Sequence, residues 1–380
     1  MSKLDELIAE LCPDGVEYVR LAECCDIEDN KRKPVKSSLR IPGDTPYYGA
    51  NNIQDYVEGY THYGQYVLIA EDGSASLENY SVQYVDGFFW ANNHVHVIKG
   101  RKDLDTKFLY YYLTSFNFIP FLTGGTRAKL NKGNMEEIPI PLPPLPVQQE
   151  IVRILDNFTE LTAELTAELT AELTARRKQY EYYRDLLLTF DDDVPRLAIS
   201  DLLIRTKGTN ITAQKMRQLH KENGEVRIFA GGKTYADVDF KDIPKKDINL
   251  NPSIIVKSRG IIEFEYYDKP FSHKNEFWSY YSENKNVNIK FVYYYLSKNV
   301  NYFQRIANNM QMPQISIPVT DKYKVPLPPI KEQERIVAIL DRFDALCNDL
   351  TSGIPAEIEA RQKQYEYYRD KLLSFKEVTS

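Results

Sequence analysis

The sequence predicts an α+β protein made of two mixed α/β domains and two long helices, related by an internal pseudo-two-fold repeat. Two observations support this class. A segment of about fifty residues with a helical period of apolar positions occurs twice. Short β-rich runs separated by Gly, Asn and Asp precede each copy. The expected organisation is an N-terminal segment (1–14), two globular domains (15–140 and 195–325) and two helical segments (141–190 and 326–375).

Length and composition describe a folded intracellular protein. The chain has 380 residues, of which 43% are hydrophobic and 27% charged, and these are ordinary values for globular proteins. No stretch of 18 apolar residues occurs, and the N-terminus has no uninterrupted apolar run, so we expect neither a membrane span nor secretion. The four cysteines lack the spacing of a disulfide scaffold or a zinc site, which favours a reduced, cytoplasmic location.

The regions 15–140 and 195–325 are expected to be two copies of one globular module. Runs such as QYVLIA (65–70) and SIIVKS (253–258) are typical of strands. Shared landmarks are FLYYYLTS (108–115) with FVYYYLSK (291–298), and YGANN (48–52) with FAGGK (229–233). The rest of the two regions diverges, so we expect the two copies to carry different surfaces.

The repeat itself predicts the helices. The matching segments are IPLPPLPVQQEIVRILDNFTEL (140–161) with VPLPPIKEQERIVAILDRFDAL (325–346), and ARRKQYEYYRDLLLTF (175–190) with ARQKQYEYYRDKLLSF (360–375). The prolines favour extended backbone before each helix. Because residues 147–190 contain no Gly or Pro, they predict one helix of roughly 44 residues, about 65 Å long. In the second copy, Gly353 and Pro355 predict a break.

Within the first helix, the unit TAEL occurs three times between Thr162 and Leu173. Four helical residues turn 400°, so each unit lengthens the helix by about 6 Å and rotates it by about 40°. As local structure this is an amphipathic helix facing solvent. The functional interpretation is compatible with it, because units can be added to a rigid spacer without breaking the helix.

No catalytic or metal-binding motif is complete. The Gly-Lys pair at 232–233 resembles the end of a phosphate-binding loop, but Arg227 stands where that loop needs its first Gly. The segment NPSI (251–254) departs from the motif of amino-group methyltransferases, and no Gly-rich cofactor loop precedes it. His94 and His96 have no evident third ligand, so we expect hydrogen-bonded strand histidines rather than a metal site.

Charge and loop composition point to nucleic acid. The formal net charge is -6, but residues 195–325 contain 21 basic and 13 acidic residues, so a local basic field exists. Polar and basic loops occur at equivalent places in both modules, as base and phosphate contacts require, although each loop alone is an ordinary polar loop. The predicted DNA-contacting residues are Lys31, Arg32, Lys33, Tyr48, Asn51, Asn52, Thr126, Arg127, Lys129, Lys132, Gly231, Gly232, Lys233, Thr234, Lys257, Arg259, Asn308, Gln311 and Gln314.

As a set, the two PLPP-to-helix segments, the two QYEYYRD segments and the TAEL repeat resemble the DNA-specificity (S) subunit of Type I restriction–modification systems, in the subgroup with TAEL spacers. The resemblance covers essentially the whole chain. It implies two target-recognition domains, each recognising one half of a bipartite, asymmetric site in double-stranded DNA. It also implies two long helices packed antiparallel like a coiled coil, with the N-terminal segment docked near the C-terminal end.

The same resemblance implies a non-catalytic chain that holds no cofactor and has no membrane contact. Two methyltransferase (modification) subunits would use S-adenosylmethionine, and restriction/translocase subunits would use ATP and Mg²⁺. The expected partner surface includes Tyr180, Tyr183, Tyr365 and Tyr368, with packing inside the helix pair as the alternative. Two rival hypotheses stay open: a scaffold that binds protein, and a stand-alone modification enzyme. Salt-dependent DNA affinity and S-adenosylmethionine binding, respectively, distinguish them.

Overall fold

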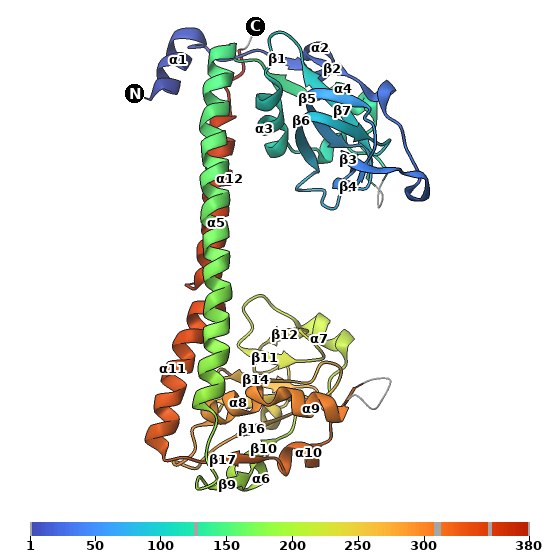
Figure 1. The fold of residues 1–380 in the computed structure, drawn as a ribbon. Helices are drawn as coiled ribbons and strands as arrows, with labels where there is room; N and C mark the ends of the chain where they lie inside the picture. Colours follow the sequence, from blue (N-terminus) through green and yellow to red (C-terminus); the bar gives the residue numbers. More distant parts are fainter. Residues whose placement is uncertain (1, 125–127, 308–312, 349–351, 379–380) are drawn as a thin grey trace. The chain divides into compact units, whose positions relative to one another are not determined.

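The chain folds into two compact units, each of which combines a globular module with part of the helical segments (Figure 1). The computed structural model describes residues 2–124, 128–307, 313–348 and 352–378. Unit 1 consists of Met1–Leu169 and Ile358–Ser380, and unit 2 of Thr170–Glu357. No helix in these described ranges is long and apolar enough to cross a membrane.

The globular part of unit 1, here called module 1, is built around a mixed six-stranded sheet in the order β2-β7-β5-β6-β3-β4. The predicted strand QYVLIA lies in β5, which pairs antiparallel with both β6 and β7. Only the pairing of β3 with β6 is parallel within this sheet. The strands are β2 (Cys25–Ile27), β3 (Pro42–Gly49), β4 (Asn52–Val57), β5 (His62–Ala70), β6 (Val82–Ala91) and β7 (Val95–Gly100).

Helix α3 covers this sheet and carries the first FLYYYLTS landmark. It begins where the Asp105 carboxylate accepts hydrogen bonds from the backbone N–H groups of Lys107 and Phe108. A short ribbon joins the ends of the module, because β1 pairs antiparallel with β8. The remaining elements are α1 (Lys3–Leu11), β1 (Tyr18–Arg20), α2 (Leu21–Cys24), η1 (Asp29–Lys31), η2 (Ser37–Leu39), α3 (Thr106–Ser115), η3 (Ile119–Phe121), α4 (Lys132–Glu136) and β8 (Pro139–Pro141).

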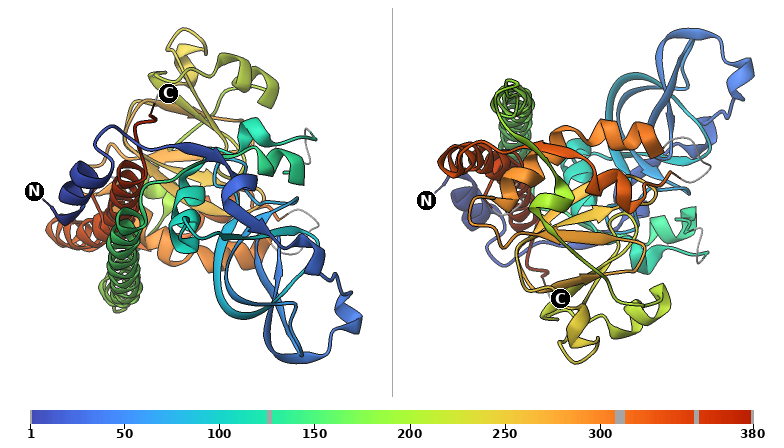
Figure 2. Two further views of the ribbon diagram at one scale, coloured as in Figure 1. Left: turned by 90° about the horizontal axis from the view of Figure 1, so that it is seen from above. Right: turned by 90° about the horizontal axis from the view of Figure 1, so that it is seen from below.

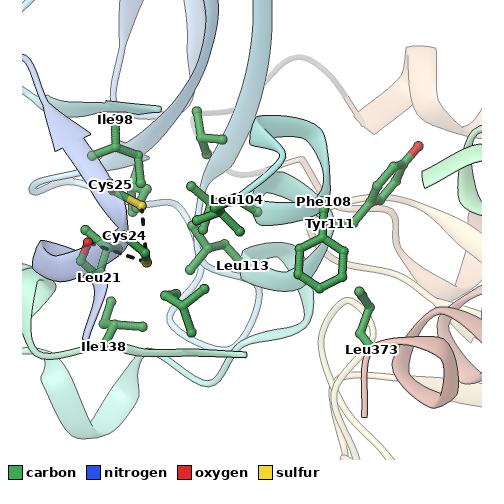
Figure 3. Packing of buried hydrophobic residues seen from close by; sticks show 14 of the residues in the cluster. Leu21, Cys24, Cys25, Ile98, Leu104, Phe108, Tyr111, Leu113, Ile138 and Leu373 are labelled. Carbon is green, nitrogen blue, oxygen red and sulfur yellow. Dashed lines mark hydrogen bonds between the residues drawn. The ribbon is translucent and has the colours of Figure 1, made fainter. Parts of the chain in front are cut away.

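The core of unit 1 lies between α3, the sheet and the ends of the helical segments. Figure 3 shows Phe108 of α3, Ile98 of β7 and Leu373, beyond α12, in one apolar cluster. The neighbouring thiols of Cys24 and Cys25 lie in the same cluster, 3.9 Å apart. Burial of these side chains holds the module against the helices through the hydrophobic effect.

In unit 1 the first part of α5 (Leu145–Leu187) runs antiparallel to α12 (Ile354–Leu372), side by side in Figures 1 and 2. Phe158 contacts Tyr368, with ring centroids 6.0 Å apart. Thr159 lies one position further along α5, and its hydroxyl is 3.0 Å from that of Tyr365, which is earlier in α12. The antiparallel helix pair expected from the family resemblance is therefore confirmed here.

The two ends of the chain meet in unit 1. The Val16 N–H donates to the Lys376 carbonyl (2.9 Å), and the Val378 N–H donates to the Val16 carbonyl (3.1 Å). Helix α1 is held by Lys3, whose ammonium pairs with the Glu150 carboxylate at 2.8 Å. The expectation that the N-terminal segment docks near the C-terminal end is confirmed.

The globular part of unit 2, module 2, repeats this plan with two sheets, ordered β10-β16-β13-β14 and β12-β11-β15. The ribbon equivalent to β1/β8 is β9/β17. The strands of module 2 are β9 (Arg196–Ala198), β10 (Ile204–Thr206), β11 (Val226–Phe229), β12 (Tyr235–Val238), β13 (Ser253–Lys257), β14 (Glu263–Tyr267), β15 (Phe271–His273), β16 (Trp278–Tyr281) and β17 (Lys324–Pro326). Its helices are α6 (Ile199–Leu202), α7 (Ala213–Leu219), η4 (Lys245–Asp247), α8 (Ile289–Lys298), α9 (Val300–Ala307) and α10 (Ile317–Asp321).

The split of the second sheet has a local cause. In module 1, β6 pairs with β5 and then, near its end, with β3. In module 2 the equivalent chain is divided into β14, which pairs with β13, and β15, which pairs with β11. Pro270 lies between these two strands and has no N–H to donate to a ladder, which accounts for the interruption.

In unit 2 the last part of α5 packs against α11 (Ile330–Asn348), and Tyr180 and Tyr183 both contact Phe343. The second helical segment is not continuous, since α11 ends at Asn348 and α12 begins at Ile354. The break predicted from Gly353 and Pro355 is confirmed.

Candidate nucleic-acid interface

Each module is fixed to its helical segment by an equivalent polar junction. In unit 1 the carboxylate of Asp156, on α5, accepts hydrogen bonds from the Lys107 ammonium (2.8 Å) and the Tyr111 hydroxyl (2.6 Å), both on α3. Burial and this carboxylate together raise the pKa of Tyr111 well above its ordinary value, so the phenol stays a donor. The junction sets the orientation of α3 and therefore of the sheet that α3 covers.

Unit 2 contains the same junction on the repeated residues. The Asp341 carboxylate accepts from the Lys290 ammonium at 2.9 Å and from the Tyr294 hydroxyl at 2.5 Å. Asp341 lies 185 residues after Asp156 in the sequence, the spacing of the repeat. The two modules are thus attached in the same way, and differences between them lie in their loops.

In module 1 the predicted loops come together beyond the C-terminal end of β5. The side-chain amide of Asn51, at the tip of the β3–β4 hairpin, donates to the Gly73 carbonyl at 2.7 Å, and its oxygen accepts from the Ala75 N–H at 2.8 Å. Lys129 forms backbone bridges with both Asp72 and Thr123. Asn51 therefore holds the hairpin tip against the loop after β5 and uses both ends of its amide to do so.

Several predicted cations of module 1 are engaged with carboxylates. The Arg32 guanidinium binds Glu71 at 2.8 Å and also donates to the Val95 carbonyl at 2.7 Å, and its side chain is only 16% exposed. The Lys129 ammonium binds the other oxygen of Glu71, also at 2.8 Å. Burial opposes ionisation of Glu71, but these two hydrogen bonds outweigh it and lower the pKa of its carboxyl. Arg32 therefore stabilises the loop after β5 from its buried side.

The other predicted residues of module 1 differ in exposure. Lys31 and Lys132 are exposed and pair with Glu28 and Glu136. Tyr48 is 9% exposed and packs in the core, so it contributes to the interior of the module rather than to its surface. The remaining two predicted residues in described positions, Lys33 and Asn52, are also exposed.

In module 2 two predicted segments lie side by side. Arg259 forms an antiparallel backbone bridge with Gln314, and both residues are exposed. The Gly260 N–H donates to the Pro313 carbonyl (2.8 Å) on one side of this bridge. Lys257, by contrast, is 7% exposed, and its ammonium binds the Glu265 carboxylate at 2.7 Å, so it contributes to β13 rather than to the surface.

The predicted turn Gly231–Thr234 forms the tip of the β11–β12 hairpin. The Thr234 N–H donates to the Gly231 carbonyl at 3.3 Å, and Gly232 has a φ of 63°, a conformation that favours glycine. Lys233 and Thr234 are exposed. Four other predicted residues, Thr126, Arg127, Asn308 and Gln311, lie outside the described residues.

The two histidines singled out in the sequence occupy different environments. His96 is buried, with Nδ1 2.7 Å from the Asp29 carboxylate and Nε2 2.8 Å from the Leu130 carbonyl, as a hydrogen-bonded strand histidine should be. His94 was expected in the strand as well, but it lies in the turn before β7, with Nδ1 2.6 Å from Asp72. Within the described ranges, no group of three or more His, Cys, Asp or Glu side chains could hold a metal ion.

The sequence did not single out Asp72 in the loop after β5, nor Gln148 and Gln333, the completely buried glutamines of the helical segments. A signal for Asp72 was present, because EDG at 71–73 and SRG at 258–260 both follow a predicted strand. The signal was hidden because these loops are offset by 187 residues, whereas the helical repeat is offset by 185.

The four tyrosines predicted to bind partner subunits lie against neighbouring helices of their own unit. Tyr180 and Tyr183 contact Phe343, Tyr365 contacts Thr159, and Tyr368 contacts Phe158. Tyr180 and Tyr365 are half-buried, as the alternative of helix-pair packing expects, whereas Tyr183 and Tyr368 are 36% and 41% exposed. The adjacent Tyr182 and Tyr367, also 185 residues apart, are 64% and 63% exposed.

Comparison with known proteins agrees with this architecture. The family model of the Type I restriction modification DNA specificity domain matches twice, over residues 13–175 and 197–360. A putative type I restriction enzyme specificity subunit of Haemophilus influenzae is 46% identical over 376 residues, covering 95% of this chain and 96% of the relative. The EcoR124I/EcoR124II specificity subunit of Escherichia coli is 34% identical over 71% of this chain and 70% of its own length.

Solved structures share the fold. The S subunit of the Type I restriction-modification system of M. genitalium superimposes with a TM-score of 0.55 at 17% identity, covering 94% of this chain and 96% of that chain. The HsdS subunit of Thermoanaerobacter tengcongensis gives a TM-score of 0.52 at 16% identity, over 96% and 97% of the two chains. With two matching domains and a full-length relative, the chain belongs to the family of Type I restriction–modification specificity subunits.

Proposed function

We propose that this chain recognises a bipartite, asymmetric site in double-stranded DNA, with module 1 contacting one half-site and module 2 the other. As a specificity subunit it is the non-catalytic member of its complex. The proposed contact surface is the group of loops beyond β5 in module 1 and beyond β13 in module 2. It includes Asn51, Lys129, Lys233, Arg259 and Gln314.

One observation carries the proposal: the two modules share a scaffold and differ in their loops. The junctions at Asp156 and Asp341 are the same, yet one hairpin tip is braced by Asn51 and the other is an exposed Gly-Gly-Lys-Thr turn. A protein that read a symmetric site would need the same contacts twice. Two different loop sets on one scaffold suit two different half-sites.

The proposal assigns the chemistry to partner subunits. Two methyltransferase subunits would bring S-adenosylmethionine, and restriction/translocase subunits would bring ATP and Mg²⁺. The proposed location of the complex is the cytoplasm, where free thiols such as the four cysteines of this chain are stable. We place the partner surface on Tyr182 and Tyr367, because they are more exposed than the neighbouring Tyr183 and Tyr368.

DNA binding as a function of salt tests the proposal. The affinity of the full chain with its methyltransferase subunits should fall steeply as salt rises, because phosphate contacts release counterions. Lys233→Ala should weaken binding, whereas Lys285→Ala should not. Lys285 is an exposed lysine that follows β16, and β16 runs antiparallel to β13, so it lies at the other end of the sheet from Arg259. Salt-independent affinity would favour a protein-binding scaffold.

A further inference from the structure

Asp72 of module 1 and Arg259 of module 2 occupy the same position in the repeated fold. Each is the second residue after the central strand, β5 or β13. Asp72 forms a backbone bridge with Lys129, and Arg259 forms one with Gln314. The flanking hydrogen bonds also correspond: Leu130 N–H to Glu71 carbonyl at 2.8 Å, and Ile315 N–H to Ser258 carbonyl at 3.0 Å.

The residue beside this position, on the adjacent strand, also differs between the two modules. His94 stands before β7, and the same register on β16 places Glu276 there. His94 contacts Asp72, and the two side chains are 47% and 40% exposed. Burial raises the pKa of Glu276, but hydrogen bonds from Lys274 and from its own backbone N–H, together with the charges of Lys274 and Arg259, outweigh it and lower the pKa. At these two equivalent positions module 1 therefore has Asp72 and His94, whereas module 2 has Arg259 and Glu276.

These side chains offer opposite hydrogen-bonding chemistry. A carboxylate only accepts, so the contact between Asp72 Oδ1 and His94 Nδ1 requires the proton on Nδ1. The remaining oxygen of Asp72 is then still an acceptor, and so is Nε2 of a neutral His94. Arg259 carries only donors. In the major groove, cytosine N4 and adenine N6 are donors, whereas guanine O6 and N7 are acceptors.

We propose that Asp72 and Arg259 are specificity-determining residues at equivalent places of the two half-sites. Asp72 selects a base that exposes an amino group, and Arg259 selects guanine. This rests on the proposed function, because it assumes that these loops face the major groove. At this position, the asymmetry of the target would follow from a charge reversal on a common scaffold.

Selection from DNA randomised in both half-sites tests this, using the full chain with its methyltransferase subunits. Wild type should require one base pair at one position of the first half-site. Each base pair exposes one amino group in the major groove, so the cytosine or adenine of the recovered pair identifies the group that Asp72 contacts. Asp72→Ala should reduce that discrimination about tenfold. Asp72→Arg should replace the preferred base with guanine, and Arg259→Ala should relax one guanine of the second half-site only.

Asp103→Arg is the matched control, because Asp103 is exposed and follows β7, at the opposite end of the sheet from Asp72. Retention of the other positions of the first half-site shows that module 1 of an Asp72 variant is folded. An unchanged first half-site in Asp72→Ala overturns the proposal even if Asp72→Arg does not bind. A wild type that accepts all four base pairs at the altered position also overturns it. Failure of wild type to select any half-site instead contradicts the proposed function itself.

Discussion

Gln148 makes in unit 1 the three hydrogen bonds that Gln333 makes in unit 2. The Gln148 oxygen accepts from the Asp105 N–H (2.8 Å), and its amide donates to the Asp103 and Pro143 carbonyls (2.8 and 2.7 Å). Gln333 accepts from the Asn288 N–H (2.8 Å) and donates to the Asn286 and Pro328 carbonyls (3.0 and 2.7 Å). Each glutamine is completely buried and joins three segments that would otherwise leave backbone groups unpaired.

Gln148→Leu should therefore destabilise unit 1 by about 1–3 kcal/mol, because it leaves buried backbone groups without partners. Hydrogen exchange should accelerate at Asp105 and leave Asn288 unchanged. The exposed neighbour is the control, and Gln149→Leu should have a small effect. Equal loss of protection in both units would contradict the independence of the two junctions.

Glu150 predicts an acid-sensitive attachment of α1. Hydrogen bonds from Arg153 and Lys3 lower the pKa of its carboxyl from 4.5 to about 2. Since the folded-state pKa is depressed, the pairing contributes its full stability above about pH 4.5 and loses it as the pH falls toward 2. Urea unfolding should show Glu150→Gln less stable than wild type at pH 7, with the gap narrowing by pH 3. A gap that stays constant, or one that the exposed Glu6→Gln reproduces, would contradict this.

The contact between the two ends of the chain depends on the backbone conformation of Gly15. Its φ is +119°, and a Cβ atom there would lie 2.3 Å from the Lys376 carbonyl oxygen. Gly15→Ala should cost about 1–3 kcal/mol and expose residues 373–378 to limited proteolysis. Gly133→Ala is the control, because its nearest neighbour to a new Cβ is the Asn131 side chain at 3.5 Å. Unchanged proteolysis in Gly15→Ala would show that the ends are not held by this contact.

The TAEL repeat predicts a change in DNA spacing. Deleting Thr162–Leu165 shortens α5 by about 6 Å and rotates the remainder of the helix by about 40°. One base pair of B-DNA spans about 3.4 Å and twists by about 36°, which is close to the rotation of the helix. We therefore expect the spacer to become one base pair shorter, so that both modules still face the groove. Both half-sites should be retained, because no recognition loop is changed. Selection from DNA with variable spacer length measures this, and Thr162→Ala, which keeps the length, should leave the spacer as in wild type. An unchanged spacer after the deletion would show that the repeat is a solvated helix face and does not set the spacing.

The helical segments could be predicted because their determinants are local. The apolar period, the proline openings and Gly353 with Pro355 act within a few residues of one another. The interface was harder to predict, since the role of a cation depends on distant partners. Arg32 binds Glu71, which is 39 positions further along the chain, and Lys257 binds Glu265 on the neighbouring strand. Asp72 and Arg259 were matched through strand register, because their loops share only the glycine that follows and are offset by 187 residues rather than 185.

The central claim is that each module recognises one half of a bipartite site. The most direct measurement is selection of bound DNA by the complex after region 195–325 has been replaced by the same region of a relative. The account predicts that one half-site changes while the other half-site and the spacer remain as in wild type. A simultaneous change of both half-sites would contradict it.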